Sequence, residues 1–276
     1  MTNILVFYHI KDNDGVGSAW VAWKKFKKQA QYFGIDYHYD LDFDYHNKTI
    51  YFLDVHPNLE KINHLKQNNN RLILIDHHAT SEKQLHLYDD YKFDLSHSAA
   101  VLSFQYFFPQ EKTPRLLKYI EDIDLWKFQV PFSREINNAL EFLGNDFTKW
   151  NKIARELENT HLRQKYLKIG KIITQYQDRL IEKLVSKAKL VKMEGRIVLA
   201  VNSPILISEV GNALALKKPP FAIVWSEINN KRWFSLRSDC SCDVSEIAEK
   251  YGGGGQRGAA AFFLERTEPF PWQEIK

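Results

Sequence analysis

Short apolar runs alternate with stretches of helical periodicity through the first half of the chain. The runs at residues 4–8, 49–53 and 71–75 are rich in β-branched, leucine and aromatic residues and are too short for helices. Between them, apolar side chains recur every three or four residues in segments 16–26 and 59–65, which predicts amphipathic helices. Nearly continuous apolar runs are typical of strands buried on both faces. The alternation therefore predicts an α/β fold with a parallel, doubly wound sheet.

The character of the chain changes after residue 150. Residues 151–192 contain no proline, are rich in Lys, Glu, Gln, Leu and Ile, and keep a rough helical rhythm. We interpret them as a helical connector between a domain at 1–150 and a smaller α/β domain at 193–276. The alternative is that they add surface helices to a single domain. Further strands and one helix are expected at residues 196–201, 221–225, 232–236, 243–251 and 259–264, with a tight turn at Asn229-Asn230.

Composition and charge exclude several classes of protein. Of the 276 residues, 44% are apolar and 26% charged, which is ordinary for a globular protein, and no apolar run is long enough to span a bilayer. The N-terminus lacks the basic start and cleavage site of a signal peptide, so a cytoplasmic protein is expected. A formal charge of +4 and a pI near 8.8 tolerate an anionic substrate but fall short of the dense positive face of a duplex-DNA binder.

Acidic and imidazole side chains follow each of the three strands predicted in the first half. These are His9, Asp12 and Asp14, then Asp54, then Asp76, His77 and His78. Ligands of open α/β sheets bind at the carboxyl ends of the strands, and carboxylates that converge there need a compensating positive charge. The donor set suits two divalent ions that share a carboxylate, Mn²⁺ first and Mg²⁺, Co²⁺ or Zn²⁺ otherwise. Each aspartate taken alone would more simply be a turn or helix cap.

At these residues the sequence resembles the DHH phosphoesterases, a family named for the Asp-His-His motif found here at residues 76–78. Segment 9–19 (HIKDNDGVGSA) is similar to the first motif of the family, and Asp54 to its second. Segment 116–126 (LLKYIEDIDLW) matches the Leu-Leu-x-Tyr-Ile-x-Asp-x-Asp-Leu-Trp pattern of shorter bacterial members. Segment 252–262 is similar to the Gly-rich motif of the associated small DHHA1 domain. The resemblance covers nearly the whole chain and implies a DHH catalytic domain followed by a DHHA1 substrate-binding domain.

The resemblance implies a metal-binding role for each matching position. One ion would be held by His9, Asp12 and Asp54. The other would be held by Asp14, Asp54, His77 and Asp122, so that Asp54 bridges the two. One departure is that two residues separate His9 from Asp12, where many members have three.

Two further roles follow for the Asp-His-His motif. Asp76 would fix the ring of His77, as metal-bound imidazoles usually require, and His78 would reach the scissile phosphate or its leaving group. In the fourth motif, segment 116–126, we expect Asp122 to be the metal ligand. Asp124, two residues later, would cap the helix end or orient a neighbouring side chain.

The resemblance also implies substrate contacts in the second domain. The matching residues are Arg237, Gly253, Gly254, Gly255, Gln256 and Arg257. Glycines let backbone N–H groups approach a phosphate closely, and a guanidinium binds phosphate through forked hydrogen bonds. The family motif usually ends in His where this chain has Gln256, which donates a hydrogen bond but carries no charge, so we expect altered affinity or preference. The alternative for Arg257 is a solvated surface arginine.

The resulting expectation is a two-metal phosphodiesterase or phosphohydrolase. By family analogy its substrates are short single-stranded oligonucleotides, cut by an exonuclease or nanoRNase-like activity, or small phosphorylated nucleotides. No membrane partner is expected, and a homodimer is left open. Two alternatives remain: a catalytically weak nucleotide-binding or sensor protein with the same fold, to which Gln256 points, and a polyphosphate or pyrophosphate hydrolase.

Overall fold

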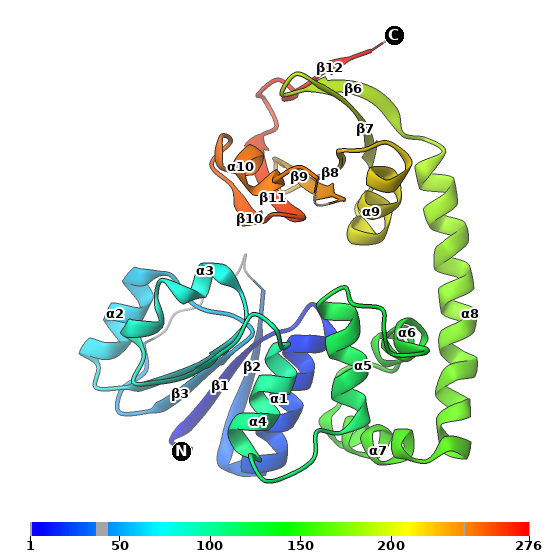
Figure 1. Cartoon of the computed structure of the whole chain (residues 1–276). Helices are drawn as coiled ribbons and strands as arrows, with labels where there is room; N and C mark the ends of the chain where they lie inside the picture. Colours follow the sequence, from blue (N-terminus) through cyan, green and yellow to red (C-terminus); the bar gives the residue numbers. More distant parts are fainter. Residues whose placement is uncertain (1, 37–43, 240, 276) are drawn as a thin grey trace. The chain divides into compact units, whose positions relative to one another are not determined.

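The computed structural model describes residues 2–36, 44–239 and 241–275, which form two compact units (Figure 1). The first unit is Met1–Thr174 and the second is Gln175–Lys276. The division falls within one long helix, α8 (Thr160–Val185). No helix in the described part of the chain is long and apolar enough to cross a membrane.

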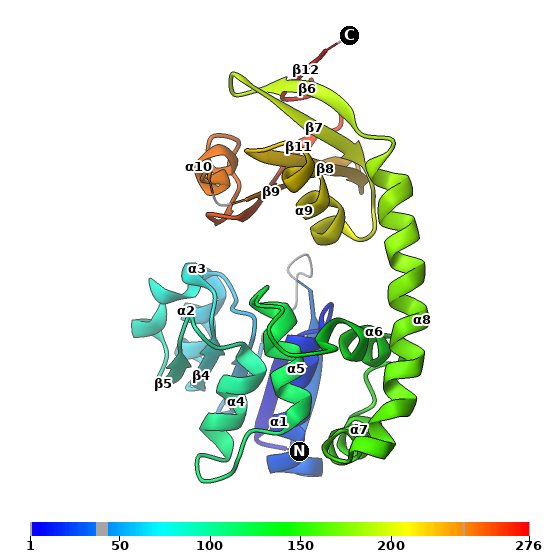
Figure 2. The same ribbon diagram turned by 45° about the vertical axis from the view of Figure 1, so that its right-hand side comes forward.

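The first unit contains a five-stranded, fully parallel sheet (Figures 1 and 2). Its strands are β1 (Ile4–His9), β2 (Ala30–Ile35), β3 (Thr49–Leu53), β4 (Arg71–Asp76) and β5 (Asp90–Phe93), in the order β2-β1-β3-β4-β5. The prediction of β1, β3 and β4 is confirmed. Strands β2 and β5 were not predicted, because they lie at the edges of the sheet, bury fewer side chains and so show a weaker apolar pattern.

Side chains of the central strands alternate between two cores. Val6 and Ile73 belong to a core on one face, which also receives residues of α1 (Asn13–Phe26), α4 (Ala99–Phe107) and α5 (Arg115–Asp124). Leu5 and Phe52 belong to the other core, which is closed by α2 (Leu59–Gln67). Helices cover both faces, which confirms the doubly wound sheet. The other elements of this unit are η1 (Lys27–Gln29), α3 (Ala79–Glu82), η2 (Leu85–Leu87), α6 (Ser133–Leu143) and α7 (Phe147–Glu158).

The segment expected as a connector at 151–192 is divided between the two units. Helix α7 buries Trp150 and Leu157 in the core of the first unit, and Tyr166 of α8 joins the same core. At its other end the segment contains a strand, β6 (Lys189–Met193), which belongs to the sheet of the second unit. A domain boundary at residue 150 would cut through a buried helix, so the first unit extends to Thr174.

The second unit is a mixed sheet with helices on both faces, and Ile181 and Leu184 of α8 pack against one of these faces. Its remaining elements are β7 (Arg196–Asn202), α9 (Ile207–Lys217), β8 (Phe221–Ile228), β9 (Lys231–Ser238), α10 (Val244–Glu249), β10 (Gly254–Gln256), β11 (Ala259–Glu265) and β12 (Gln273–Glu274). The order is β10-β11-β9-β8-β7-β6-β12, with β7 and β8 parallel and the other pairs antiparallel. Asn229 and Asn230, both at positive φ, close the β8–β9 hairpin, which confirms the predicted tight turn.

Candidate metal centre

The end of β1 and the start of α1 bring His9 and Asp12 together. Asp12 caps α1: one carboxylate oxygen accepts the Gly15 N–H at 2.9 Å, and the other lies 2.7 Å from His9 Nδ1. Residue 15 has to be glycine, because a Cβ there would lie 2.0 Å from the carbonyl oxygen of His9. This close turn holds both predicted residues at the carboxyl edge of the sheet.

Asp54 follows β3, the strand adjacent to β1. The chain leaves β1 for β2 on one side and returns to β3 on the other, so β1 and β3 flank the topological switch point at which such sheets bind ligands. Asp54 is 2% exposed and has φ of 59°, an uncommon conformation for a residue other than glycine. Its Oδ2 lies 3.6 Å from His9 Nδ1 and its Oδ1 lies 3.5 Å from His77 Nε2. Asp54 thus occupies the position that a bridging ligand requires.

Strand β4 ends at Asp76, whose carboxylate is fully buried and organises the residues after it. One oxygen accepts the backbone N–H groups of His77 at 2.7 Å and His78 at 3.2 Å, and lies 2.8 Å from His78 Nδ1. The other oxygen accepts the Ser81 hydroxyl. The ring that Asp76 orients is therefore that of His78, and not that of His77 as expected.

His77 lies among carboxylates from three separate elements. Its Nε2 is 3.5 Å from oxygens of Asp54 and Asp124 and 3.8 Å from an oxygen of Asp14. Both oxygens of Asp14 also accept hydrogen bonds, at 2.7 and 2.9 Å, from the first two backbone N–H groups of α4. The positive end of that helix stabilises a carboxylate that is 1% exposed.

The structure places Asp124, and not Asp122, in this cluster. Asp122 is 2% exposed, and its carboxylate accepts the N–H groups of Gln129 at 2.7 Å and Val130 at 3.1 Å and the hydroxyl of Ser133 at 2.5 Å. Both of its oxygens therefore hold the loop after α5. This geometry corrects the choice of Asp122 as the ligand of the fourth motif.

The packing of α5 against α1 explains why Asp124 reaches the cluster. Ile120 faces α1, since a Cβ added to Gly17 would lie 3.1 Å from its Cδ1 atom. Asp124 follows Ile120 by four residues and lies on the same face of the helix, toward the beginning of α1. Asp122 lies about 200° away from Asp124 around the helix. Neither the motif nor the helical period distinguishes the two by itself, whereas the packing of Ile120 against α1 does.

Three groups of side chains each bring one ligand atom per residue within 4.8 Å of one another. The groups are His9-Asp12-Asp54, Asp14-His77-Asp124 and Asp54-Asp76-His77-His78. The first matches one predicted ion site, and the second matches the other except that Asp124 replaces Asp122 and Asp54 is not part of the group. The third shares Asp54 with the first and His77 with the second.

The electrostatics of the cluster show that it needs positive charge. Burial, and then the charge of Asp54, raise the pKa of Asp14 to about 7. Burial and the charges of Asp14 and Asp54 raise the pKa of Asp124 well above its usual range. Burial disfavours protonated His77, but the neighbouring carboxylates of Asp54 and Asp14 outweigh it and raise its pKa to about 9. Protons supply the compensating charge here, and divalent ions replace protons at sites of this kind. The oxygen and nitrogen donors can hold such ions.

In the second unit, Arg237 and Gln256 lie on the same face of the sheet. Arg237 pairs with Ala259 of β11, and Ala259 pairs with Gln256 of β10, so the three side chains form one row. The guanidinium donates to Ser208 Oγ at 2.8 Å, and burial lowers its pKa. The Arg257 side chain is exposed in the turn between β10 and β11.

The Gly-rich segment has a packing role in this hairpin. A Cβ on Gly253 would lie 2.2 Å from the carbonyl oxygen of Ala261, and one on Gly255, at φ of 148°, would lie 2.5 Å from that of Ala259. A Cβ added to Gly254 would have no neighbouring atom within 4 Å. Close approach of β10 to β11 therefore explains two of the three glycines. Their expected phosphate contacts stay a prediction.

Residues 3–123 match the DHH family, N-terminal domain. This match covers the first unit up to the end of α5, including the three predicted motifs at its sheet edge. Residues 3–123 therefore form a domain similar to the N-terminal domain of the DHH family. A relative, the uncharacterized protein R106 of Acanthamoeba polyphaga mimivirus, is 30% identical over 285 residues, which cover 93% of this chain. The chain spans 66% of the length of that relative.

Two solved structures share the fold. One is the DHH domain of a protein described as a member of a family of ribosomal proteins, with 11% identity, a TM-score of 0.66, and coverage of 99% of this chain and 83% of that one. The other is the pGpG-specific phosphodiesterase PggH of Vibrio cholerae, with 12% identity, a TM-score of 0.51, and coverage of 96% and 94%. At these identities the likeness shows the fold and nothing finer.

Proposed function

We propose that this chain is a phosphohydrolase that uses two divalent metal ions, preferably Mn²⁺, to hydrolyse phosphodiester bonds in short oligonucleotides or phosphorylated nucleotides. The observation that carries the proposal is the position of Asp54 between two groups of potential metal ligands. His9 and Asp12 complete one group, while Asp14, His77 and Asp124 surround the other. A phosphodiesterase among the solved proteins of the same fold supports this class of bond as the target.

When bound, a pair of divalent ions activates water and neutralises charge on phosphoryl oxygens. The chain's own residues hold the ions and meet the substrate. His78 Nδ1 is held by Asp76 at 2.8 Å, which leaves Nε2 as the ring nitrogen that can reach a phosphate or its leaving group. Burial disfavours the protonated ring, but Asp76 and Asp54 outweigh it and raise the pKa of His78 to about 9. When protonated, this ring can donate a hydrogen bond or a proton from Nε2 to a leaving oxygen.

Two exposed aromatic rings follow Asp124 and favour a substrate that contains nucleobases. Trp126 and Phe128 are 41% and 50% exposed, with ring centroids 4.9 Å apart. Both residues have left-handed φ, 55° and 51°, at a cost of about 1–3 kcal/mol each. Hydrogen bonds to the carboxylate and carbonyl of Asp122 hold the loop in this conformation. Bases stack on such rings, whereas polyphosphate and pyrophosphate offer nothing for them to bind.

The second unit would contact substrate phosphate. Arg237 and Gln256 share one face of its sheet, and Arg257 lies in the adjoining turn. The alternative of a nucleotide-binding or sensor protein without activity rests on Gln256. Two complete ligand groups in the first unit count against it, because packing their carboxylates together is costly without a bound cation.

The decisive experiment is a hydrolysis assay with Mn²⁺ on a panel of substrates. The panel contains RNAs of two to five nucleotides, a linear dinucleotide, a bisphosphorylated adenosine, pyrophosphate and polyphosphate. We expect hydrolysis of the base-containing phosphodiesters, loss of activity with a chelator and recovery with added Mn²⁺.

Asp54→Asn is the test variant, and Asp44→Asn is its matched control. Asp44 is exposed and precedes β3, at the opposite edge of the sheet. We expect Asp54→Asn to lose at least about a hundredfold in kcat and Asp44→Asn to keep normal activity. Normal turnover by Asp54→Asn, or no hydrolysis of any substrate with Mn²⁺, Mg²⁺ or Co²⁺, would remove the proposal.

A further inference from the structure

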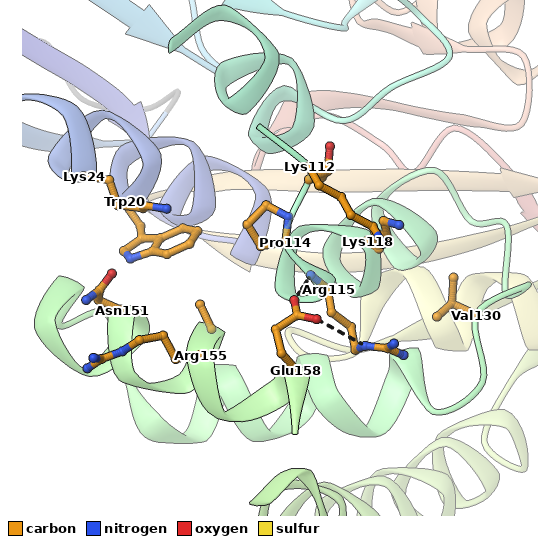
Figure 3. Close-up of a pocket in the computed structure, with 12 residues that line it drawn as sticks. Trp20, Lys24, Lys112, Pro114, Arg115, Lys118, Val130, Asn151, Arg155 and Glu158 are labelled. Atoms are coloured by element: carbon orange, nitrogen blue, oxygen red, sulfur yellow. Dashed lines mark hydrogen bonds and ion pairs between the residues drawn. The ribbon is translucent and has the colours of Figure 1, made fainter. Parts of the chain in front are cut away.

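The first unit has a pocket of about 430 Å³ at the end of α5 opposite to Asp124 (Figure 3). It lies between α1, α5, α7 and the segment that precedes α5. Trp20, Pro114 and Ala154 are among the apolar residues that line it. This volume falls in the range of small-molecule sites, about 300–1,000 Å³.

The pocket is strongly positive. Its lining includes five cationic side chains and one carboxylate: Lys24, Lys112, Arg115, Lys118, Arg155 and Glu158. The resulting formal charge of +4 equals that of the whole chain. The formal charges of the remaining residues sum to zero. Such a field attracts anions and concentrates them locally.

Lys24 is fixed at the pocket by aromatic rings. Its ammonium lies 5.2 Å from the ring centroid of Trp20, 5.4 Å from that of Phe104 and 5.2 Å from that of Phe108. These cation–π contacts hold a charged group beside the apolar lining without neutralising it. The pocket thus combines an apolar surface with a positioned positive charge.

One carboxylate of the chain, that of Glu158, already lies in the lining of the pocket. Glu158 of α7 accepts the backbone N–H of Arg115, the first residue of α5, at 2.7 Å, and its other oxygen lies 3.8 Å from Arg115 Nε (Figure 3). Its carboxylate satisfies one N–H group at the positive end of α5. It cannot satisfy the remaining cations, which leaves the pocket with a large excess of positive charge.

We propose that this pocket binds an organic phosphate, with the apolar part of the ligand against Trp20 and Pro114 and its phosphate among the lysine and arginine side chains. The site is separate from the metal centre. Helix α5 has its first residue in the pocket and its last residue, Asp124, in the metal cluster, about 15 Å apart along the helix. The inference does not depend on any catalytic activity of that cluster.

Calorimetric titration of the whole chain with adenosine 5′-monophosphate, in the presence of a chelator, tests the proposal. The chelator removes metal-dependent binding and turnover from the measurement. Adenosine and inorganic phosphate are titrated separately. We expect the monophosphate to bind at least about tenfold more tightly than either fragment, because only it uses both the apolar lining and the cations.

Three variants locate the binding. Lys112→Glu/Lys118→Glu is expected to weaken it at least about tenfold, and Glu158→Gln is expected to strengthen it, because the change removes a competing negative charge. Lys187→Glu, at an exposed position in the second unit, is expected to leave it unchanged. The lysines are exposed, so the double variant is expected to fold normally, as thermal unfolding can verify.

Three results would overturn the proposal. They are absence of binding at millimolar monophosphate, equal affinity for inorganic phosphate, and unchanged binding in the double lysine variant. An unchanged or weaker affinity in Glu158→Gln would likewise contradict the assignment of the phosphate to this pocket.

Discussion

Asp122 and Asp124 offer a sharp test of the site, because they are two residues apart on α5 and the structure gives them different tasks. Asp124 lies 3.5 Å from His77 in the metal cluster. Asp122 instead accepts three hydrogen bonds from the loop after the helix. Exchange of each for asparagine or alanine should therefore affect different properties of the protein.

The cost of Asp122→Ala can be estimated from the hydrogen bonds. Its removal leaves two backbone N–H groups and a buried hydroxyl without their acceptor, at about 1–3 kcal/mol each. Some of these groups reach water after the change, so we expect a total of about 3–5 kcal/mol in the free energy of unfolding. In a unit of this size that corresponds to a fall of about 10 °C in Tm. Asp122→Asn keeps an acceptor and should cost less.

Asp124→Asn should show the opposite behaviour. Burial and the charges of Asp14 and Asp54 raise the pKa of Asp124 well above its usual range, so its charged form is disfavoured in the metal-free protein. Its neutral isostere should leave the Tm in chelator unchanged or slightly higher. Changes in groups that support a metal ligand typically weaken metal binding about 10–100-fold. Loss of a ligand oxygen itself should have a larger effect, so we expect Mn²⁺ affinity to fall at least about a hundredfold.

Thermal unfolding in chelator and calorimetric titration with Mn²⁺ measure both quantities on the same samples. The assignment fails if Asp124→Asn binds Mn²⁺ normally while Asp122→Asn, at an unchanged Tm, does not. It also fails if both asparagine variants lower the Tm in chelator by the same amount.

Three further predictions follow from other parts of the first unit. The folded pKa of Asp14, about 7, lies above its ordinary value, so this group favours the metal-free fold below about pH 4 and loses that contribution as the pH rises through 7. Unfolding measured in chelator should therefore lose stability less steeply with rising pH in Asp14→Asn than in wild type, and equal slopes would contradict this. Trp126→Ala should raise KM for a diribonucleotide about tenfold or more, because stacking contributes about 1–3 kcal/mol per base. The KM for an abasic analogue should stay unchanged, and an equal rise in KM for both substrates would argue against stacking. Gly15→Ala should destabilise the protein by about 1–3 kcal/mol or more, because its Cβ would lie 2.0 Å from the carbonyl oxygen of His9. Gly254→Ala, where the Cβ has open space, should change the free energy of unfolding by no more than about 0.5 kcal/mol. Chemical denaturation of both variants compares the two effects.

Much of the fold could be predicted from local patterns. Strands β1, β3 and β4 are buried on both faces and therefore carry continuous apolar runs that are readable in sequence. Edge strands β2 and β5 lack that pattern because part of each lies at the surface. The boundary of the first unit was misplaced for a related reason. A helical rhythm shows that α7 is a helix, but it does not show which core receives Trp150.

The sequence by itself determined which kinds of groups follow each central strand, and parallel strand order then required them to meet at one edge of the sheet. Only the tertiary structure decided which atoms face one another: Asp124 and not Asp122 beside His77, and Asp76 against the ring of His78. Those choices depend on the rotation of α5 against α1 and on side-chain directions after β4. Such relations arise from packing between distant segments, which no local pattern of residues records.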